Sequence, residues 1–441
     1  MTKYDLAVVI AARREEFLLP TILDVLKARR GNTQIVVIAD GEWPIEPIPD
    51  LADVTLIHHP VSIGQRAACN EGIRISNSTF CMKLDAHCRL SEGFDVTLLK
   101  DMQPNWLVVP RLYNLHVFDF RCLGCGVRSY QGPKPNVCGT CQGTEFEKVM
   151  VWLPRDGQHW SCSECQEYFH SKEQPKTCPL CGASKRFKNI ENRVTDSQRI
   201  DSELHFQYFR DFHPQEGLAA FIHAKGEAWI HRLLATDLAT PDARRLSRMK
   251  EYVAAYEALE LPAKFRLRDK AIKMLAFMRS TTHATKAGKA QTSRLLGLIE
   301  LAQGHLVETM SILGACWLVR KDFYFDVLGG LDEQVGSWGQ MGQEICAKVW
   351  LSGNRVICHR GVWYSHLFRT SAGFSFPYGM APGAQQAAKE YSRNLWRNNL
   401  WPGQVYPLSH LVSRFWPVPG WSNEDLAQQK AREVGWKPRR K

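Results

Sequence analysis

The chain has 441 residues, of which 44% are hydrophobic and 23% are charged, an ordinary globular composition. This length predicts about two or three domains and argues against disorder over most of the chain. No apolar run approaches the ~20 residues of a membrane span. The short run Leu6–Ala12 is followed by charged residues instead of a cleavage site, so we expect a buried strand there and a cytoplasmic protein.

The formal net charge of +11 is unevenly distributed along the chain. Residues 1–110 carry −3, residues 111–200 carry +4, residues 241–300 carry +7 and residues 389–441 carry +6. A basic excess confined to later segments suits a polyanionic partner such as nucleic acid. The alternative interpretation is a well-solvated basic surface, and charge alone does not decide between the two.

The first 110 residues alternate apolar strands with amphipathic helices. The predicted strands are Leu6–Ala11, Gln34–Ala39, Val54–His58 and Phe80–Leu84, and the predicted helices are Phe17–Arg29 and Gly64–Ile75. This alternation predicts an α/β fold with a mostly parallel sheet. Such sheets bind ligands at the carboxyl ends of their strands, here just after Ala11, Ala39 and Leu84.

Later segments differ in character. Residues 111–200 are rich in Gly, Pro and Cys, and residues 201–305 are predicted to be helical, with a basic stretch from Arg244 to Arg294. Strand and helix patterns return from Ser311 to about Ser365, and the tail from Lys389 is rich in Trp and Arg. The tail tryptophans either stack on nucleic-acid bases or cap a core.

Eight of the fourteen cysteines form a strict repeat. They are Cys122, Cys125, Cys138 and Cys141, followed forty positions later by Cys162, Cys165, Cys178 and Cys181. Two C-x2-C turns separated by twelve residues supply the four thiolates of a tetrahedral Zn²⁺ site. We expect two closed, structural zinc sites. The modules either contact nucleic acid or stabilise a region too small to bury its own core.

A carboxylate and an imidazole follow the fourth predicted strand, in the run Leu84-Asp85-Ala86-His87. Positions i and i+2 at a strand end project to the same side, so Asp85 and His87 can share a divalent ion such as Mn²⁺ or Mg²⁺. On spacing alone, a turn aspartate and a surface histidine is the simpler interpretation.

The order of the motifs favours the metal site. A strand, Asp40-Gly41, a helix with Gly64-Gln65-Arg66 and then Leu84–His87 resemble the nucleotide-sugar-binding half of a family-2 GT-A glycosyltransferase. The runs Gly314–Phe325, Trp338–Glu344 and Trp363–Arg369 resemble the second half of the catalytic domain of polypeptide N-acetylgalactosaminyltransferases. The resemblance covers about residues 5–110 and 308–380. It implies a Rossmann-like GT-A domain, and in this interpretation the pair of zinc ribbons and the helical segment are inserted between its two halves.

The resemblance also implies roles for single residues. Asp85, His87 and His366 correspond to the metal ligands, and Asp40 to the carboxylate that contacts the donor nucleoside. The family's usual donor is a UDP-sugar. Ala11, Ala12 and Arg13 would lie by its base or ribose, Gly64 and Arg66 near its base and pyrophosphate. Arg369 would neutralise the diphosphate, and Tyr378 would belong to a loop that closes over it.

The acceptor side departs from the family pattern. Polypeptide transferases carry a glutamate directly after a Trp-Gly-Gly triplet, whereas Trp338-Gly339-Gln340 is followed here by Met341. An inverting reaction needs a base, for which Glu344 is the first candidate and Asp332 the second. A retaining reaction needs none, because the leaving diphosphate can take the proton. Glu344 could equally be a structural carboxylate.

The expected domains are 1–110 and 306–388 for the two halves of the transferase, 111–200 for the zinc ribbons, 201–305 for the basic helical insertion and 389–441 for the tail. The runs Glu308–Met310, Gly336–Gly342 and Tyr391–Trp396 are also similar to phage-associated glycosyltransferases that hypermodify DNA. The sequence hypothesis is therefore transfer from a UDP-sugar to a hydroxymethylated pyrimidine in DNA, in the bacterial host cytoplasm if phage-encoded. The alternatives are a glycan or protein acceptor, or an inactive zinc-ribbon nucleic-acid-binding protein.

Overall fold

The computed structural model describes residues 3–184, 186–196, 198–208, 305–336, 339–368, 383–415, 418 and 420–438. The chain divides into two compact units. Unit 1 contains Met1–Thr195, Gly314–Met341 and His359–Ala388, and unit 2 contains Asp196–Leu313, Gly342–Cys358 and Lys389–Lys441. This division groups the segments differently from the expected boundaries: the zinc region belongs to unit 1, and residues 306–313 and 342–358 of the expected second transferase half belong to unit 2. The basic stretch Arg244–Arg294 lies outside the described residues.

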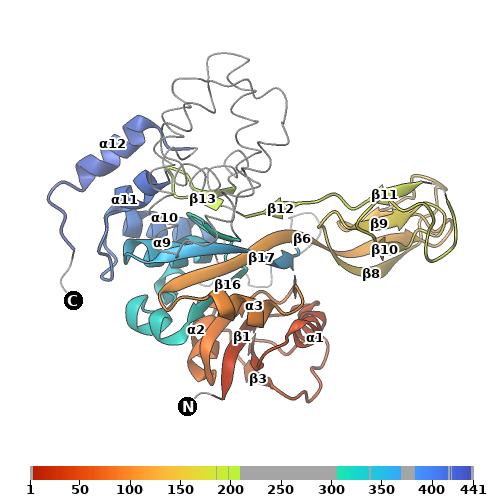
Figure 1. The fold of residues 1–441 in the computed structure, drawn as a ribbon, viewed down its shortest axis with the longest axis horizontal. Coiled ribbons are helices and arrows are strands. Elements are labelled where there is room, and N and C mark those ends of the chain that lie inside the picture. Colours follow the sequence, from red (N-terminus) through yellow and green to blue (C-terminus); the bar gives the residue numbers. More distant parts are fainter. Residues whose placement is uncertain are drawn as a thin grey trace, which may run out of the picture. The chain divides into compact units, whose positions relative to one another are not determined.

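The parallel part of the unit 1 sheet comes from the first strands of the chain (Figure 1). β1 (Tyr4–Ala12) pairs in parallel with β2 (Thr33–Asp40) on one side and β4 (Ser78–Leu84) on the other, and β3 (Val54–His59) pairs in parallel with β2. Nearly every residue of β1 and β2 is buried, as expected for strands covered on both faces. The α/β prediction is confirmed.

The predicted helices of this half are also confirmed. α1 (Leu18–Ala28) buries Leu18, Ile22 and Val25, which recur at helical spacing. α2 (Gln65–Ile75) packs so closely on the sheet that a Cβ at Gly72 would lie 2.5 Å from Cγ1 of Val9. Only glycine therefore fits at this position. α3 (Phe94–Asp101) completes the helices before the long strand β6 (Trp106–Cys122).

Later segments complete the sheet beside the Asp85–His87 turn. β16 (Cys316–Arg320) lies antiparallel between β4 and β6. β17 (Arg355–His366), which belongs to unit 1 from His359 onward, pairs with β5 (Cys88–Leu90) and places His366 opposite Cys88. The last residue of β17 therefore lies next to the turn that carries His87.

A network around Asn70 of α2 holds the chain after β16. This chain forms a π-helical turn (Phe323–Val327) and a 3-10 turn (Glu333–Val335). The Asn70 amide donates to the Leu331 carbonyl at 2.9 Å and accepts from the Tyr324 hydroxyl at 2.6 Å. Unit 1 therefore joins sequence-distant segments through buried polar contacts as well as through the sheet.

β6 continues into a ribbon arm, which we define as residues 115–190. In Figure 1 its strands gather at one end of β6. They are β7 (Arg128–Tyr130), β8 (Phe146–Pro154), β9 (His159–Cys162), β10 (Tyr168–His170) and β11 (Phe187–Asn189). β7 and β8 flank β6 antiparallel, and β10 and β11 flank β9 in the same way. The cysteine repeat is thus a structural repeat of two three-stranded ribbons, after which β12 (Val194–Thr195) returns to β6.

The two ribbons are joined by a buried polar network centred on Asp119, whose side chain is fully buried. Asp119 contacts Nε2 of His116 at 2.6 Å and accepts from the Tyr168 hydroxyl at 2.8 Å. Burial and the neighbouring Asp119 carboxylate raise the pKa of Tyr168, so its hydroxyl remains a donor. Arg128 of the first ribbon contacts Glu167 of the second at 2.6 Å. These bonds make the arm one body instead of two independent fingers.

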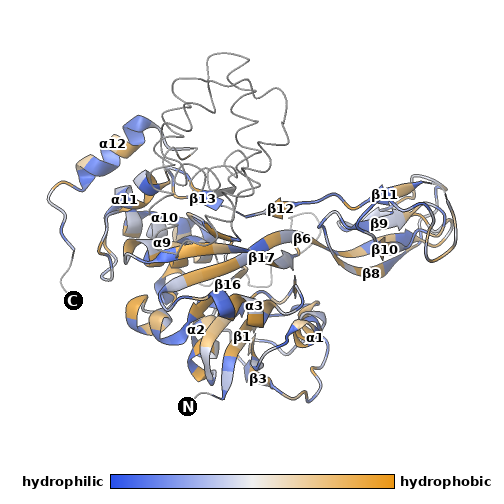
Figure 2. Cartoon of the chain, viewed as in Figure 1, coloured by the Kyte–Doolittle hydropathy of each residue, from blue (hydrophilic) through white to orange (hydrophobic). Residues whose placement is uncertain are grey.

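Unit 2 has its own core and contains the described residues of the tail. Its elements are β13 (Gln198–Ile200), β14 (Phe206–Tyr208), β15 (Leu306–Glu308), most of α9 (Met341–Leu351) and α10 (Ala384–Arg397), α11 (Leu408–Arg414) and α12 (Asn423–Arg432). Glu308 is fully buried and accepts from Arg414 at 2.8 Å through both oxygens, and Arg355 contacts it as well. In Figure 2, α12 is mostly hydrophilic with a hydrophobic patch.

Three tail tryptophans, Trp396, Trp401 and Trp421, are core residues, whereas Trp436 is partly exposed. Trp396, Trp401 and Trp421 are 2%, 9% and 8% exposed, and Nε1 of Trp421 donates to the Ile200 carbonyl at 3.0 Å. Of the two interpretations, capping a core is the one observed, because rings buried to this extent cannot stack on bases. Within the described part of the chain, no helix is long and apolar enough to cross a membrane.

Candidate active site and zinc sites

Three predicted metal ligands of unit 1 converge at the end of β4. Asp85 and His87 follow that strand directly, and His366 ends β17. Nε2 of His366 lies 3.1 Å from Nε2 of His87 and 3.3 Å from Oδ2 of Asp85. One ligand atom from each residue lies within 4.8 Å of the others. The strand-end spacing and the distant histidine thus form a single constellation.

The donor set fits a divalent ion. Two imidazole nitrogens face each other and share one proton at most, so an ion between them would use lone pairs that otherwise oppose each other. Burial lowers the pKa of His366 to about 4, despite the hydrogen bond to Asp85, and the neutral imidazole is the metal-binding form. Nδ1 of His366 is buried without a hydrogen-bond partner. The carboxylate adds a ligand suited to Mn²⁺ or Mg²⁺.

Lys83 is a part of this site that the sequence reasoning missed. Its side chain is 2% exposed, and Nζ contacts Asp85 and donates to the Gly314 carbonyl at 2.7 Å. Burial would raise the pKa of Asp85, but the Lys83 ammonium and the hydrogen bond from His366 outweigh it and hold that pKa well below its usual range. The sequence signal that could have identified it is a lysine inside the otherwise apolar predicted strand Phe80–Leu84.

Glu15 is a second missed residue. Its side chain is 4% exposed and its Oε2 lies 3.4 Å from Nδ1 of His87, on the other edge of the ring from Nε2. Nothing in the run Arg13-Arg14-Glu15-Glu16 separates this buried glutamate from its exposed neighbour. Only the fold shows which of the two carboxylates turns inward.

The predicted donor-side carboxylate, Asp40, ends β2 and is fully buried. It accepts from the Ser62 hydroxyl at 2.9 Å and from the backbone N–H groups of Ile63 and Gly64 at 2.6 and 3.0 Å. Gly41 has a φ of +84°, and a Cβ there would lie 2.8 Å from the Ser62 nitrogen. Through these hydrogen bonds, Asp40 fixes the loop of residues 62–64, which leads into α2. Contact with a nucleoside remains a prediction.

Other predicted donor residues lie on the same half of unit 1. Ala11 is buried in β1, and Arg13, just beyond its end, lies 3.9 Å from Glu42. Arg66 is 1% exposed, and its guanidinium donates to the carbonyls of Gly336 and Gly339. These bonds connect α2 to Gly336 and Gly339, which follow the 3-10 turn. Arg369 and Tyr378 lie outside the described residues.

The two candidates for a catalytic base belong to different units. Asp332 of unit 1 caps the 3-10 turn and accepts from the Gln334 N–H at 3.0 Å. Glu344 of unit 2 is 1% exposed and lies 2.9 Å from Nζ of Lys348, one turn later on α9. Each contact is one that a structural carboxylate makes. The catalytic role of either residue stays a prediction.

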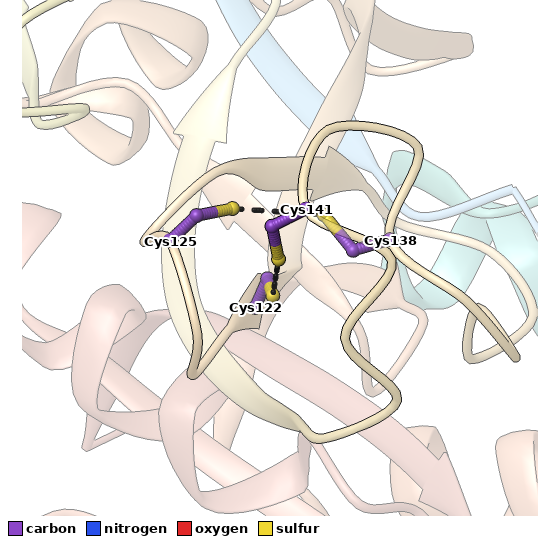
Figure 3. Close-up of side chains that lie close together, drawn as sticks. All are labelled: Cys122, Cys125, Cys138 and Cys141. Carbon is purple, nitrogen blue, oxygen red and sulfur yellow. Dashed lines mark hydrogen bonds between the residues drawn. The ribbon is translucent and has the colours of Figure 1, made fainter.

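The cysteine clusters have the shape of zinc sites. In the first, sulfur atoms from two turns converge, with Cys122 and Cys141 3.5 Å apart and Cys125 and Cys138 3.6 Å apart (Figure 3). The second places Cys162 and Cys181, and Cys165 and Cys178, 3.8 Å apart. Tetrahedral Zn–S bonds require S–S separations of about 3.8 Å. The backbone N–H groups of Cys141 and Thr140 lower the pKa of Cys138 to about 6, which favours the thiolate ligand.

Residues 7–114 match the family model described as glycosyl transferase family 2. This span runs from β1 into β6 and includes Asp85 and His87. Among solved structures, the chain is similar to the crystal structure of GalNAc-T7 with UDP, GalNAc and Mn²⁺, with 14% identity and a TM-score of 0.44. The match covers 98% of this chain and 55% of that one, so the chain spans about half the length of its structural neighbour. No curated protein matches the sequence.

Proposed function

We propose that the chain, whose residues 7–114 match the family-2 glycosyltransferase model, is a GT-A glycosyltransferase that transfers a sugar from a UDP-sugar to the hydroxyl of a hydroxymethylated pyrimidine in DNA. The observation that carries the transferase part is the convergence of Asp85, His87 and His366 at the carboxyl end of β4. Ligands of open α/β sheets bind at this edge. The resemblance of the sequence motifs to family-2 glycosyltransferases makes a UDP-sugar the working choice of donor.

In the reaction, the bond between the anomeric carbon and the diphosphate oxygen breaks while the acceptor oxygen bonds to that carbon. A divalent ion at Asp85, His87 and His366 would neutralise charge on the departing diphosphate. Arg369 would add a positive charge there. The acceptor proton passes to Glu344 or Asp332 if the configuration inverts, or to the diphosphate if it is retained. The protein's main task is to hold the hydroxyl in line with the anomeric carbon.

The DNA acceptor is supported by the ribbon arm and by the basic segments of the sequence. Zinc ribbons present rigid loops to macromolecules, and exposed lysines of the arm suit phosphate contacts. The exposed lysines are Lys134, Lys148, Lys172, Lys176 and Lys188. A C5-hydroxymethyl group lies in the major groove, where an enzyme reaches it without reading the base-pairing edge.

Zinc binding limits how much of this affinity the arm provides. Residues 111–200 carry +4, counting cysteines as neutral. Four thiolates around one Zn²⁺ carry about −2, so two loaded sites bring the region close to neutral. Non-specific attraction to DNA then depends mainly on the segments 241–300 and 389–441, which carry +7 and +6. We therefore expect the arm to position the DNA acceptor and to add little to its non-specific electrostatic attraction.

An acceptor panel tests this proposal. The purified protein is incubated with UDP-glucose, UDP-GlcNAc or UDP-GalNAc and Mn²⁺, together with DNA containing hydroxymethylcytosine, hydroxymethyluracil or neither, and UDP release is followed. We expect release to accelerate only with hydroxymethylated DNA, and to be lost in Asp85→Asn. Acceleration by a glycan or peptide acceptor instead would retain the transferase and reject DNA. Hydrolysis of the UDP-sugar that depends on metal but not on DNA, with no other acceptor used, would also reject DNA as the acceptor.

A further inference from the structure

Glu15 occupies a position that the proposed catalytic scheme does not use. It follows β1 in a turn that leads into α1, and its carboxylate is buried against the edge of the His87 ring. Its Oε2 lies 3.4 Å from Nδ1 of His87, whereas Nε2 of the same ring lies 3.1 Å from Nε2 of His366, which in turn contacts Asp85. The histidine therefore lies between a carboxylate on one edge and the candidate metal ligands on the other.

This arrangement determines which nitrogen can bind a metal. A carboxylate beside Nδ1 favours the tautomer that carries its proton there, and this leaves the lone pair on Nε2. It also restricts rotation of the ring. In the absence of such a partner, the proton of a neutral imidazole is free to occupy Nε2, where it would block coordination.

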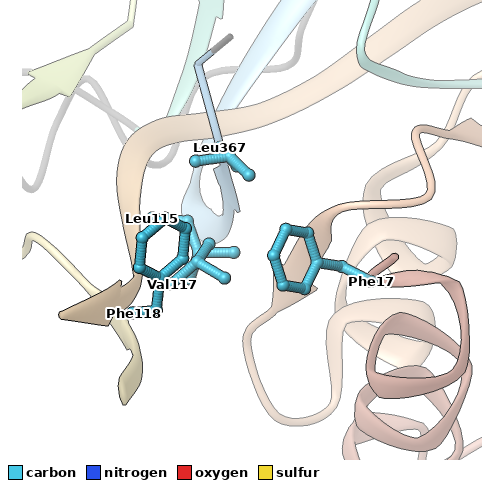
Figure 4. Close-up of a cluster of buried hydrophobic side chains, with 5 residues drawn as sticks. All are labelled: Phe17, Leu115, Val117, Phe118 and Leu367. Carbon is cyan, nitrogen blue, oxygen red and sulfur yellow. The ribbon is translucent and has the colours of Figure 1, made fainter. Parts of the chain in front are cut away.

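The turn that carries Glu15 is itself fixed by the base of the ribbon arm. The next residue, Glu16, forms an ion pair with Lys148 of β8. Phe17 then packs in a buried cluster with Leu115, Val117 and Phe118 of β6 and with Leu367, which directly follows His366 (Figure 4). The backbone N–H of Leu367 donates to the His87 carbonyl at 3.2 Å. The same small cluster thus borders both histidines and explains why Glu15 has a defined position.

We propose that Glu15 is a positioning residue for the metal ligand His87: it holds the proton on Nδ1 and directs Nε2 toward Asp85 and His366. The proposal rests on the metal site of the proposed function but not on the identity of the acceptor. Glu15 acts through His87 and needs no contact with donor or acceptor. Replacing Glu15 should therefore change the affinity for the metal ion, which can be measured without any sugar or DNA.

The test compares Glu15→Ala, Glu15→Gln and the adjacent control Glu16→Gln. Free Mn²⁺ is titrated by electron paramagnetic resonance against each purified full-length protein, without donor or acceptor. We expect Glu15→Ala to raise the Kd for Mn²⁺ by about 10–100-fold, as for other partners of metal-bound histidines. Glu15→Gln keeps an acceptor oxygen without the charge, so its Kd should lie between those of the alanine variant and the wild type. Glu16→Gln removes only a solvent-exposed ion pair, so its Kd for Mn²⁺ should stay close to that of the wild type and well below that of Glu15→Ala.

Two further readouts separate the possible outcomes. Zinc content and the thermal unfolding midpoint, measured without Mn²⁺, show whether a variant is folded; if Glu15→Ala is not, the isosteric Glu15→Gln decides the question. Wild-type Mn²⁺ affinity in a folded Glu15→Ala or Glu15→Gln protein would overturn the positioning role if Asp85→Asn loses binding. If Asp85→Asn also binds normally, the metal site is elsewhere, and the proposed site chemistry fails together with this inference.

Discussion

Lys83 and Asp85 form a largely buried ion pair at the carboxyl end of β4, where the lysine ammonium contacts Oδ1 of the carboxylate and Nε2 of His366 lies 3.3 Å from Oδ2. Both side chains project to the same side because they are two positions apart at a strand end. The lysine keeps Asp85 ionised in a buried setting, so the carboxylate is ready to bind a cation. This pair yields the first prediction.

Lys83→Met should destabilise the protein and make it more dependent on metal. Removing one partner of a buried ion pair leaves the other charge uncompensated, at a cost of about 3–5 kcal/mol. A divalent ion at Asp85 would offset part of this cost. Urea unfolding with and without saturating Mn²⁺ should show a larger stabilisation by Mn²⁺ in the variant than in the wild type. Equal stabilisation of both proteins would mean that Lys83 and the metal do not act on the same carboxylate.

The zinc ribbons provide a matched pair of variants, because Cys138 and Cys178 occupy equivalent positions in the repeat. Cys138→Ser and Cys178→Ser should each reduce bound zinc from about two ions per chain to one, since a four-thiolate site loses an essential ligand. Elemental analysis after gel filtration measures this. Retention of two zinc ions in either variant would show that the corresponding cluster is not a zinc site.

The same two variants should differ in their effect on the rest of unit 1. The first cluster adjoins β6 and β8, which carry Phe118 and Lys148 against the Glu15–Phe17 turn. The second cluster is connected to β6 through the Asp119 network. Cys138→Ser should therefore weaken Mn²⁺ binding more than Cys178→Ser does. Equal Mn²⁺ affinity in the two variants would indicate that the base of the arm is stable without its zinc.

The buried tail tryptophans should matter for stability and not for nucleic-acid binding. Trp396→Ala should lower the free energy of unfolding by about 3–5 kcal/mol, because it removes a large ring from a packed core. Its affinity for DNA, measured by fluorescence anisotropy at a temperature where the variant is folded, should equal that of the wild type. A folded variant with normal stability and lost DNA affinity would restore the base-stacking interpretation.

The salt dependence of DNA binding should identify the basic segments involved. Each lost phosphate contact reduces the slope of log K against log salt by about 0.9. Changing Lys264, Arg266, Arg268 and Lys270 to Gln should therefore reduce the slope more than changing Lys134, Lys172, Lys176 and Lys188, which lie in the charge-balanced arm. The opposite order would assign the main phosphate contacts to the ribbons.

Local patterns predicted the parts of the fold that depend on spacing. Alternation of strands and helices predicted the parallel sheet, and the cysteine spacing predicted both thiolate clusters. The Asp85-x-His87 pair could be predicted because a strand end places both side chains on the same side. His366, in contrast, came from the order of motifs alone, since only the β5–β17 pairing brings it next to His87.

Local sequence patterns could not predict contacts between segments that lie far apart in the sequence. Glu15 and Glu16 are identical residues in sequence, and their opposite roles depend on the packing of Phe17 against β6. Similarly, the aromatic-basic composition of the tail suits a binding surface, but Trp396, Trp401 and Trp421 are buried in unit 2. Burial of this kind follows from tertiary packing, which composition does not encode.

We propose that the chain is a metal-dependent glycosyltransferase that acts on modified DNA. The most direct test is to incubate wild-type protein or Asp85→Asn with UDP-sugars, Mn²⁺ and DNA containing hydroxymethylcytosine or hydroxymethyluracil. The DNA is then digested and its nucleosides are analysed by mass spectrometry. We predict a mass gain of one sugar on a hydroxymethylated nucleoside, with the wild-type protein only. An unchanged nucleoside profile with every donor, from a protein that binds Mn²⁺ and hydrolyses a UDP-sugar, would contradict the DNA acceptor.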